Sequence, residues 1–240
     1  MMLSFATFDK AVEDNNFWTQ DNMGDLSAQI RGKHGEDAEG RSGLTLVVGC
    51  PLPTPAQKYV AGLRQDLSRR LAQCGIAEPV WRTELSALHV TVYGLLVPDD
   101  YERDRALCDS LMKLAFDDLS EAAHGWPRFT MTLKGFGILG RGALAVRVAD
   151  SAEVTQIRDH AASIPQVSSR GYVERRDLNQ MVIGRLQPCL EDGQRQMLRG
   201  LYEEFKDSEL HELVVDSLSL VRYEHEFLTQ ISSCRIITLG

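Results

Sequence analysis

The order of periodic segments constrains the fold of this chain more than any other feature. From residue 43 onward, short β-rich runs alternate with stripes of apolar residues at three- and four-residue spacing, the spacing of amphipathic helices. Written as types, residues 43–139 read β-α-β-α-β and residues 143–240 read β-α-β-α-β-β. This order occurs twice with little identity between the halves, which indicates an old duplication.

Such an order is typical of an α+β protein. We expect a two-lobed, pseudo-symmetric molecule in which antiparallel sheets line a central cleft and helices cover their outer faces. The lobes should span about 43–140 and 141–240, and together they form one domain. Residues 1–42 are polar, and we expect an N-terminal arm or extended loop that partly docks on this body. Its strong apolar anchors are Phe5, Phe8, Phe17 and Trp18.

The composition limits the cellular location and the classes of binding partner that we expect for this protein. The net charge is -8 and no run of Lys or Arg occurs, so binding to long nucleic acid is disfavoured, whereas a small anionic ligand needs only a few local cations. No apolar run reaches the roughly 20 residues that span a bilayer, and no signal peptide is evident. The five Cys are scattered without a C-x-x-C pair, which argues against a zinc site and favours reduced thiols. We therefore expect a cytoplasmic protein without a membrane partner, and the sequence leaves its oligomeric state open.

The clearest chemical motif is Ser86-x-x-His89-x-Thr91-Val92-Tyr93, on the second predicted strand. It resembles the first H-x-T motif of the 2H phosphoesterase superfamily, which includes 2′-5′ RNA ligase-like proteins and cyclic phosphodiesterases. The closing runs 214–223 and 236–240 also resemble the last strands of that superfamily. The resemblance covers about residues 43–240 and is strongest to a bacterial branch with an N-terminal extension.

The resemblance implies a mechanism. Two H-x-T/S motifs on symmetry-related strands place two imidazoles on opposite sides of one phosphate. One imidazole activates the attacking oxygen and the other protonates the leaving oxygen. The Thr or Ser hydroxyls donate hydrogen bonds to the non-bridging oxygens. Neither a metal nor a cofactor is required.

The second motif departs from this pattern. Hydrophobic alternation places Gln180 where the second His is expected and Val182 where the Thr or Ser is expected. Glutamine neither takes nor gives a proton near pH 7, and valine offers no polar group. Only His89 and Thr91 are therefore carried over as catalytic residues.

Further side chains are candidates for binding a substrate. Tyr93 either lines the cleft or packs against a neighbouring strand. Gln180 either reads an amide or base edge or is a relic of a retired site, and Val182 makes that wall apolar. Arg185 either reaches an anionic group or is a surface residue at a strand end. The charged run at 174–177 is expected to form a solvated loop, from which one side chain could swing over the cleft.

Three functions stay open from the sequence. The first is a divergent phosphoesterase that acts on a small phosphodiester or cyclic nucleotide with one remaining catalytic His. In the second, the same cleft performs single-base chemistry on a non-phosphate metabolite. The third is a catalytically inactive module that binds a nucleotide-like ligand or a protein.

Overall fold

The computed structural model describes most of the chain in nine segments. These are residues 3–14, 39–76, 81–96, 105–139, 142–168, 178–186, 190–206, 208–225 and 231–240. The predicted charged loop at 174–177 and the anchors Phe17 and Trp18 lie outside the described residues.

Most helices and strands follow one another in the predicted order. The strands are β1 (Glu39–Gly49), β2 (Trp81–Arg82), β3 (His89–Leu96), β4 (Phe129–Leu139), β5 (Ala143–Val148), β6 (Gln180–Arg185), β7 (Leu210–Val215), β8 (Ser217–His225) and β9 (Ile231–Thr238). The helices are α1 (Ala6–Glu13), α3 (Thr54–Gln73), the 3₁₀ turn η3 (Leu85–Ala87), α5 (Arg105–Ala123), α6 (Ala152–Ser163), α7 (Pro165–Ser168) and α8 (Asp192–Phe205). The structure thus adds α1, β2 and α7 to the predicted elements and divides the single strand predicted at 213–223 into β7 and β8. Among the described residues, no helix is both long and apolar enough to cross a membrane.

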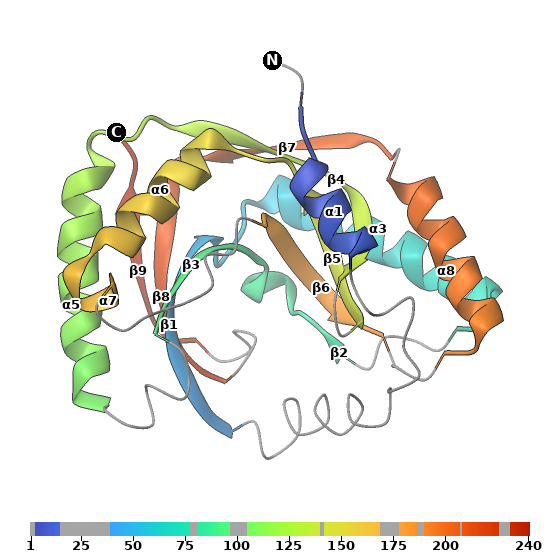
Figure 1. Cartoon of the computed structure of the whole chain (residues 1–240), viewed down its shortest axis with the longest axis horizontal. Coiled ribbons are helices and arrows are strands. Elements are labelled where there is room, and N and C mark those ends of the chain that lie inside the picture. The colour runs from blue at the N-terminus through green and yellow to red at the C-terminus, as the bar shows by residue number, and fades with distance from the viewer. Residues whose placement is uncertain are drawn as a thin grey trace.

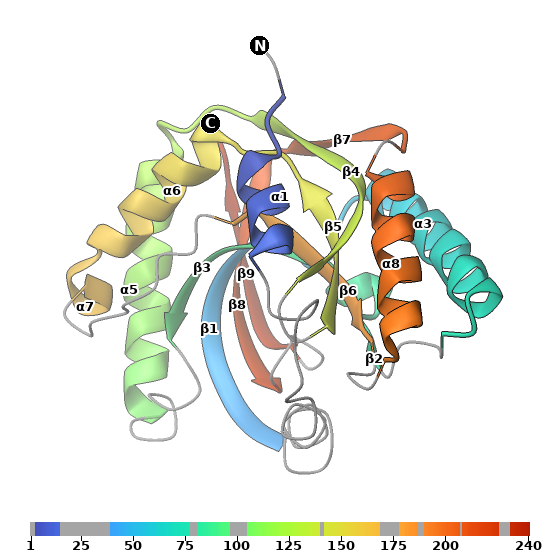
Figure 2. The same cartoon turned by 45° about the vertical axis from the view of Figure 1, so that its right-hand side comes forward.

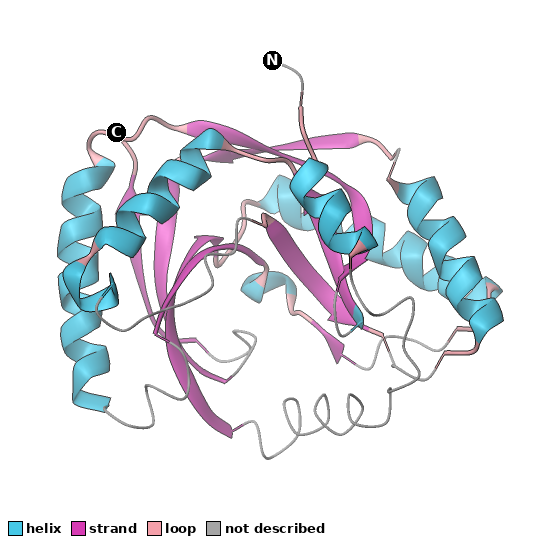
Figure 3. Ribbon diagram, in the orientation of Figure 1, coloured by secondary structure: helices cyan, strands magenta, loops and turns pink. Residues whose placement is uncertain are grey.

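Two antiparallel sheets form the body, which confirms the predicted α+β class (Figures 1 and 3). The first sheet has the strand order β3-β1-β8-β9, and the second has the order β2-β6-β5-β4-β7. Helices α5 and α6 pack on the first sheet, whereas α3 and α8 contact the second. Figure 2 shows these two helix pairs on opposite sides of the molecule.

The two sheets do not coincide with the two halves of the chain. Strand β4 belongs to the first half of the sequence but lies in the second sheet, between β5 and β7. Strands β8 and β9 belong to the second half but complete the first sheet beside β1. Each predicted lobe therefore contributes strands to both sheets, so the boundary near residue 140 separates sequence repeats and not the sheets.

One large apolar core lies between the sheets and their outer helices. On β1 it takes Leu44, Leu46 and Val48, which alternate with residues on the opposite face, as expected for a strand. We call this opposite face, turned away from the main core, the inner face of each sheet. Helix α3 adds the predicted stripe of buried residues and ends, as predicted, at a glycine: Gly75 has φ +64°, the left-handed conformation of a helix C-terminus.

Helix α1 is the exception to the outer placement of helices. It lies over the inner face of the second sheet, where Phe8 and Val12 are buried against β4 and β5 (Figure 2). Burying two such side chains contributes about 1.5–3 kcal/mol each. Strand β1 also begins at Glu39, so the body starts slightly before the predicted boundary at residue 42.

Candidate functional site

His89 is the first residue of β3 and lies opposite Gly49, the last residue of β1. The turn η3 delivers the chain into β3, and its last residue supplies a carbonyl to the imidazole. Nδ1 of His89 lies 2.8 Å from the Ala87 oxygen. A carbonyl only accepts, so Nδ1 carries the hydrogen and Nε2 of the neutral ring holds the free electron pair. The local turn thereby fixes the tautomer in which Nε2 can accept a proton.

The surroundings keep this imidazole neutral. Burial lowers the pKa of His89 below its usual value, and the hydrogen bond to Ala87, which favours the charged ring, offsets part of that effect. A buried thiol lies close by, since the Sγ atom of Cys50 is 3.8 Å from the same Ala87 oxygen. Burial and the neighbouring Cys234 raise the pKa of Cys50 to about 12. The thiol is therefore protonated at neutral pH, whereas the neutral ring of His89 keeps a free electron pair on Nε2.

Thr91 shares the inner face with His89, but Tyr93 does not. His89 and Thr91 are both half-buried, and Thr91 lies opposite Val47 of the inner face. A register shift follows, and Tyr93 lies opposite Leu46. The shift turns Tyr93 into the main core, where it is 9% exposed. Of the two alternatives for Tyr93, packing and lining the cleft, the structure therefore has packing. The regular alternation of side chains between the two faces of β3 is broken at the bulge.

Strand β6 repeats this register in the second sheet. Gln180 is its first residue and lies opposite Arg147, and Val182 lies opposite Ala145. A register shift follows Val182 just as one follows Thr91 in β3. By position in their strands, Gln180 corresponds to His89 and Val182 corresponds to Thr91. Strands β3 and β6 also contact each other.

The inner face around Val182 is covered by α1. Val182 packs against a cluster that includes Phe8, Val12 and Ala145. The floor of this contact is made of small residues, and a Cβ at Gly137 would lie only 2.6 Å from Phe8 Cε1. The apolar Val182 therefore has a packing partner in the chain itself, which the motif comparison did not anticipate.

Arg185 lies farther along β6, opposite Ala143 on one side and Trp81 of β2 on the other. Its side chain is half-buried. This placement differs from that of a surface arginine at a free strand end, because β2 covers the outer edge of β6 here. Thr83 strengthens the same edge, since its hydroxyl donates a 2.8 Å hydrogen bond to the Val182 carbonyl.

A buried arginine joins the two strands that carry the candidate residues. Arg158 of α6 is 2% exposed and donates from Nε to the Val92 oxygen at 2.9 Å. Its Nη2 donates to the Asn179 side-chain oxygen at 2.7 Å and to the Leu178 carbonyl at 3.2 Å. The guanidinium therefore links β3 of the first sheet to the residues just before β6 of the second sheet.

Sequence reasoning missed this bridge. Asn179 reaches a third segment as well, since its amide donates to the Ala149 carbonyl at 2.9 Å. One feature of the sequence could have indicated it. Arg158 directly follows the buried Ile157 and is a charged residue within the apolar face of α6. A charged residue on the buried face of a helix points to a paired partner, but sequence spacing does not say which one.

No group of three or more His, Cys, Asp or Glu side chains within the described segments is arranged to hold a metal ion. A hollow of about 490 Å³ lies elsewhere, between α3 and α8. It is lined by Asp66, Arg69, Arg70, Gln73, Glu204, Phe205 and Ser208. All but Ser208, which follows α8, lie on the outer helices α3 and α8, and none belongs to β3, the strand of His89 and Thr91.

Known structures place the fold. No protein-family model matches the chain, and the search of curated proteins gave no match. TT0787 from Thermus thermophilus is 12% identical, with a TM-score of 0.52 over 82% of this chain and 99% of its own. ATU0111 from Agrobacterium tumefaciens, described as a conserved protein of unknown function, is 17% identical, with a TM-score of 0.50 over 89% and 97%. E. coli LigT complexed with NADP+ is a more distant likeness, 14% identical with a TM-score of 0.43 over 83% and 96%. The chain therefore shares its fold with TT0787 and ATU0111 over nearly their full lengths.

Proposed function

We propose that this protein is a divergent phosphoesterase of the 2H type, which hydrolyses a small phosphodiester or cyclic nucleotide with His89 as its one imidazole. The observation that carries the proposal is the hydrogen bond from His89 Nδ1 to Ala87, which leaves Nε2 as a proton acceptor. The H-x-T resemblance supplies the reaction class, and the shared register of β3 and β6 supports a common origin of the two half-sites.

The residues suit a one-base reaction. Nε2 of His89 takes a proton from water as the water oxygen bonds to phosphorus, and the Thr91 hydroxyl donates a hydrogen bond to a non-bridging oxygen. The phosphorus–oxygen bond to the leaving group then breaks. Gln180 cannot give a proton, so the leaving oxygen takes one from solvent. Without a second imidazole as proton donor the rate is about 10²–10⁴-fold lower, which favours a strained cyclic phosphate as the substrate.

Hydrolysis of 2′,3′-cyclic nucleotides and of 2′-5′-linked oligonucleotides tests this proposal. We expect His89→Ala to lower kcat/KM by about 10²-fold or more, because it removes the base. Thr91→Val, which keeps the shape but not the hydroxyl, should cost about 10²-fold. His124→Ala, at an exposed histidine, is the matched control and should leave the rate unchanged. Equal rates for the wild type and His89→Ala would overturn the proposal.

The pH profile separates a base from an acid at position 89. The pKa of His89 lies below its usual value, and the base must be neutral to act. The rate should therefore be constant above neutral pH and fall as the pH drops through that lowered pKa. A rate that falls with rising pH instead would assign His89 the acid role.

A second function is favoured by one observation, the coverage of Val182 by α1. A site half closed by its own chain suits a binding protein that has lost the parent reaction. No turnover by the wild type of either substrate class, together with saturable binding of a 3′-nucleotide that His89→Ala weakens, would favour this alternative.

A further inference from the structure

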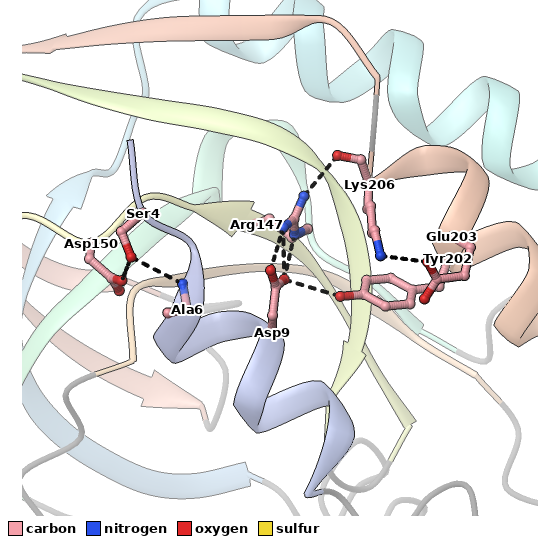
Figure 4. A network of polar contacts seen from close by, with 8 residues as sticks. All are labelled: Ser4, Ala6, Asp9, Arg147, Asp150, Tyr202, Glu203 and Lys206. Carbon is pink, nitrogen blue, oxygen red and sulfur yellow. Dashed lines mark hydrogen bonds and ion pairs between the residues drawn. The ribbon is translucent and has the colours of Figure 1, made fainter. Parts of the chain in front are cut away.

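Arg147 is a buried cation on the inner face of the second sheet. It lies on β5 opposite Gln180, and 5% of its side chain is exposed. Its Nε and Nη2 donate to the two carboxylate oxygens of Asp9 at 2.9 and 2.8 Å (Figure 4). Two parallel hydrogen bonds of this kind are the fork geometry with which arginine recognises carboxylates and phosphates.

Other groups complete the surroundings of this fork. The Tyr202 hydroxyl donates to the same carboxylate at 3.0 Å, and the third guanidinium nitrogen, Nη1, donates to the Lys206 carbonyl at 2.8 Å (Figure 4). The ring of Phe5 lies 4.6 Å from the guanidinium carbon. Burial and the Asp9 charge raise the pKa of Tyr202, so its hydroxyl stays a donor. Arg147 and Tyr202 are thus fixed donors aimed at one pair of oxygen atoms.

The occupant of these donors comes from a different part of the chain. Asp9 is on α1, 138 residues from Arg147 in sequence, whereas Arg147, Tyr202 and the Lys206 carbonyl belong to the body. The Asp9 side chain is 36% exposed, although that of Arg147 is nearly covered. The Asp9 carboxylate therefore lies between the solvent and the donor groups, on the inner-face side of Arg147.

We propose that Arg147 and Tyr202 form an oxyanion-binding subsite of the inner face, and that Asp9 is its internal occupant. The ligand class is a small oxyanion, the phosphate or carboxylate group of a ligand, which binds the same donors in competition with Asp9. An intramolecular carboxylate competes at a high effective concentration. Phe8 and Val12, buried next to Asp9, hold it in place. The subsite does not depend on hydrolysis by His89, because binding is measured without turnover.

Thermal unfolding in inorganic phosphate, against potassium chloride of equal ionic strength, tests the subsite. Asp9→Ala vacates the fork, so phosphate at about ten times its Kd should raise the Tm of this variant by about 3 °C. The double variant Asp9→Ala/Arg147→Met should show no rise, because the fork is gone. The wild type should show less than a third of the rise, because Asp9 competes.

Acetate in a parallel series distinguishes the source of the oxyanion. A rise with acetate alone assigns the fork to carboxylates, a rise with phosphate alone assigns it to phosphates, and either supports the subsite. No rise in Asp9→Ala with either anion overturns it, as does an equal rise in the double variant. A wild-type rise equal to that of Asp9→Ala overturns the role of Asp9 as occupant. Asp9→Ser, which also removes the carboxylate from the fork, replaces Asp9→Ala if the latter does not fold, with the same outcomes deciding.

Discussion

Arg147 and Arg158 are both almost fully buried, but they bind different kinds of acceptor. Arg147 is paired with the carboxylate of Asp9. Arg158 donates to the backbone carbonyls of Val92 in β3 and of Leu178, just before β6, and to the Asn179 amide oxygen. A guanidinium presents five donors in a rigid plane, so it can satisfy several carbonyls at a sheet edge. The first arginine thus binds a group that a ligand could imitate, and the second fixes the scaffold on which His89 and Gln180 stand.

Replacing Arg158 should therefore cost stability in proportion to the acceptors it leaves unpaired. Each buried acceptor without a partner costs about 1–3 kcal/mol, so Arg158→Met should lower the free energy of unfolding by about 3 kcal/mol or more. Arg158→Lys should recover little, because a single ammonium cannot span carbonyls of both strands. Urea denaturation measures both variants. Arg69→Met is the matched control, since Arg69 is 66% exposed and pairs with Asp66 one turn away; it should change stability by less than about 0.5 kcal/mol. A loss at Arg158 no larger than this control would contradict the bridge.

Single residues also show where sequence reasoning stops. The position of His89 at a strand start followed from the motif and its apolar neighbours, which are local features. The pairing of Asp9 with Arg147 did not, because nothing within a few residues of either specifies a partner 138 positions away. Tyr93 is an intermediate case. Its strand was predicted, but the register shift that turns its side chain into the main core depends on the pairing with β1.

Among the elements, α1 changes the interpretation of the second half-site most. The sequence marked Phe5 and Phe8 as anchors of an arm, but eight helical residues are too few to predict a helix from periodicity alone. Its position depends on a patch of small residues on β4 and β5, namely Gly137, Ala143 and Ala145, which come together only in the folded sheet. The hydrophobic alternation around Val182 reports a strand but not what covers it.

A larger side chain in this patch of small residues should detach α1. A Cβ at Gly137 would approach Phe8 Cε1 to 2.6 Å and Val12 Cγ2 to 2.8 Å, both closer than van der Waals contact. Gly137→Val should therefore displace α1 while valine still suits the strand, at a cost of about 1–3 kcal/mol. Hydrogen exchange of residues 6–13 should accelerate, with little change in β5.

The matched control is another glycine with open space around it. A Cβ at Gly62 of α3 would meet no atom within 4 Å, so Gly62→Ala should leave α1 protected and stabilise the helix by up to about 1 kcal/mol. If Gly137→Val left the hydrogen exchange of α1 unchanged, the contact of Phe8 with this patch of small residues would not be what holds the helix on the sheet.

For the whole molecule, the exchange of strands between the halves matters more than the repeat itself. The sequence predicted most of the order of elements because each has a local period, but it missed α1, β2 and α7 and the division of the run 213–223 into β7 and β8. It did not predict that β4 joins the second sheet and β8 the first, because strand pairing joins segments far apart in the chain. The consequence is mechanical: neither half of the chain contains a complete sheet.

This exchange predicts that both sheets unfold in one cooperative step. Leu44 of β1 is fully buried in the first sheet, and Leu44→Ala should cost about 2–5 kcal/mol. Native-state hydrogen exchange should show the same loss of free energy for the slowest amides of β5 and β6 as for those of β1 and β8. Leu114→Ala, at a side chain of α5 that is 44% exposed, is the control and should change neither sheet by much. If the two sheets were independent units, Leu44→Ala would weaken β1 and β8 alone. A uniform loss would show instead that the sheet bearing His89 and the sheet bearing Arg147 are stable only together, so that any ligand bound to one stabilises both.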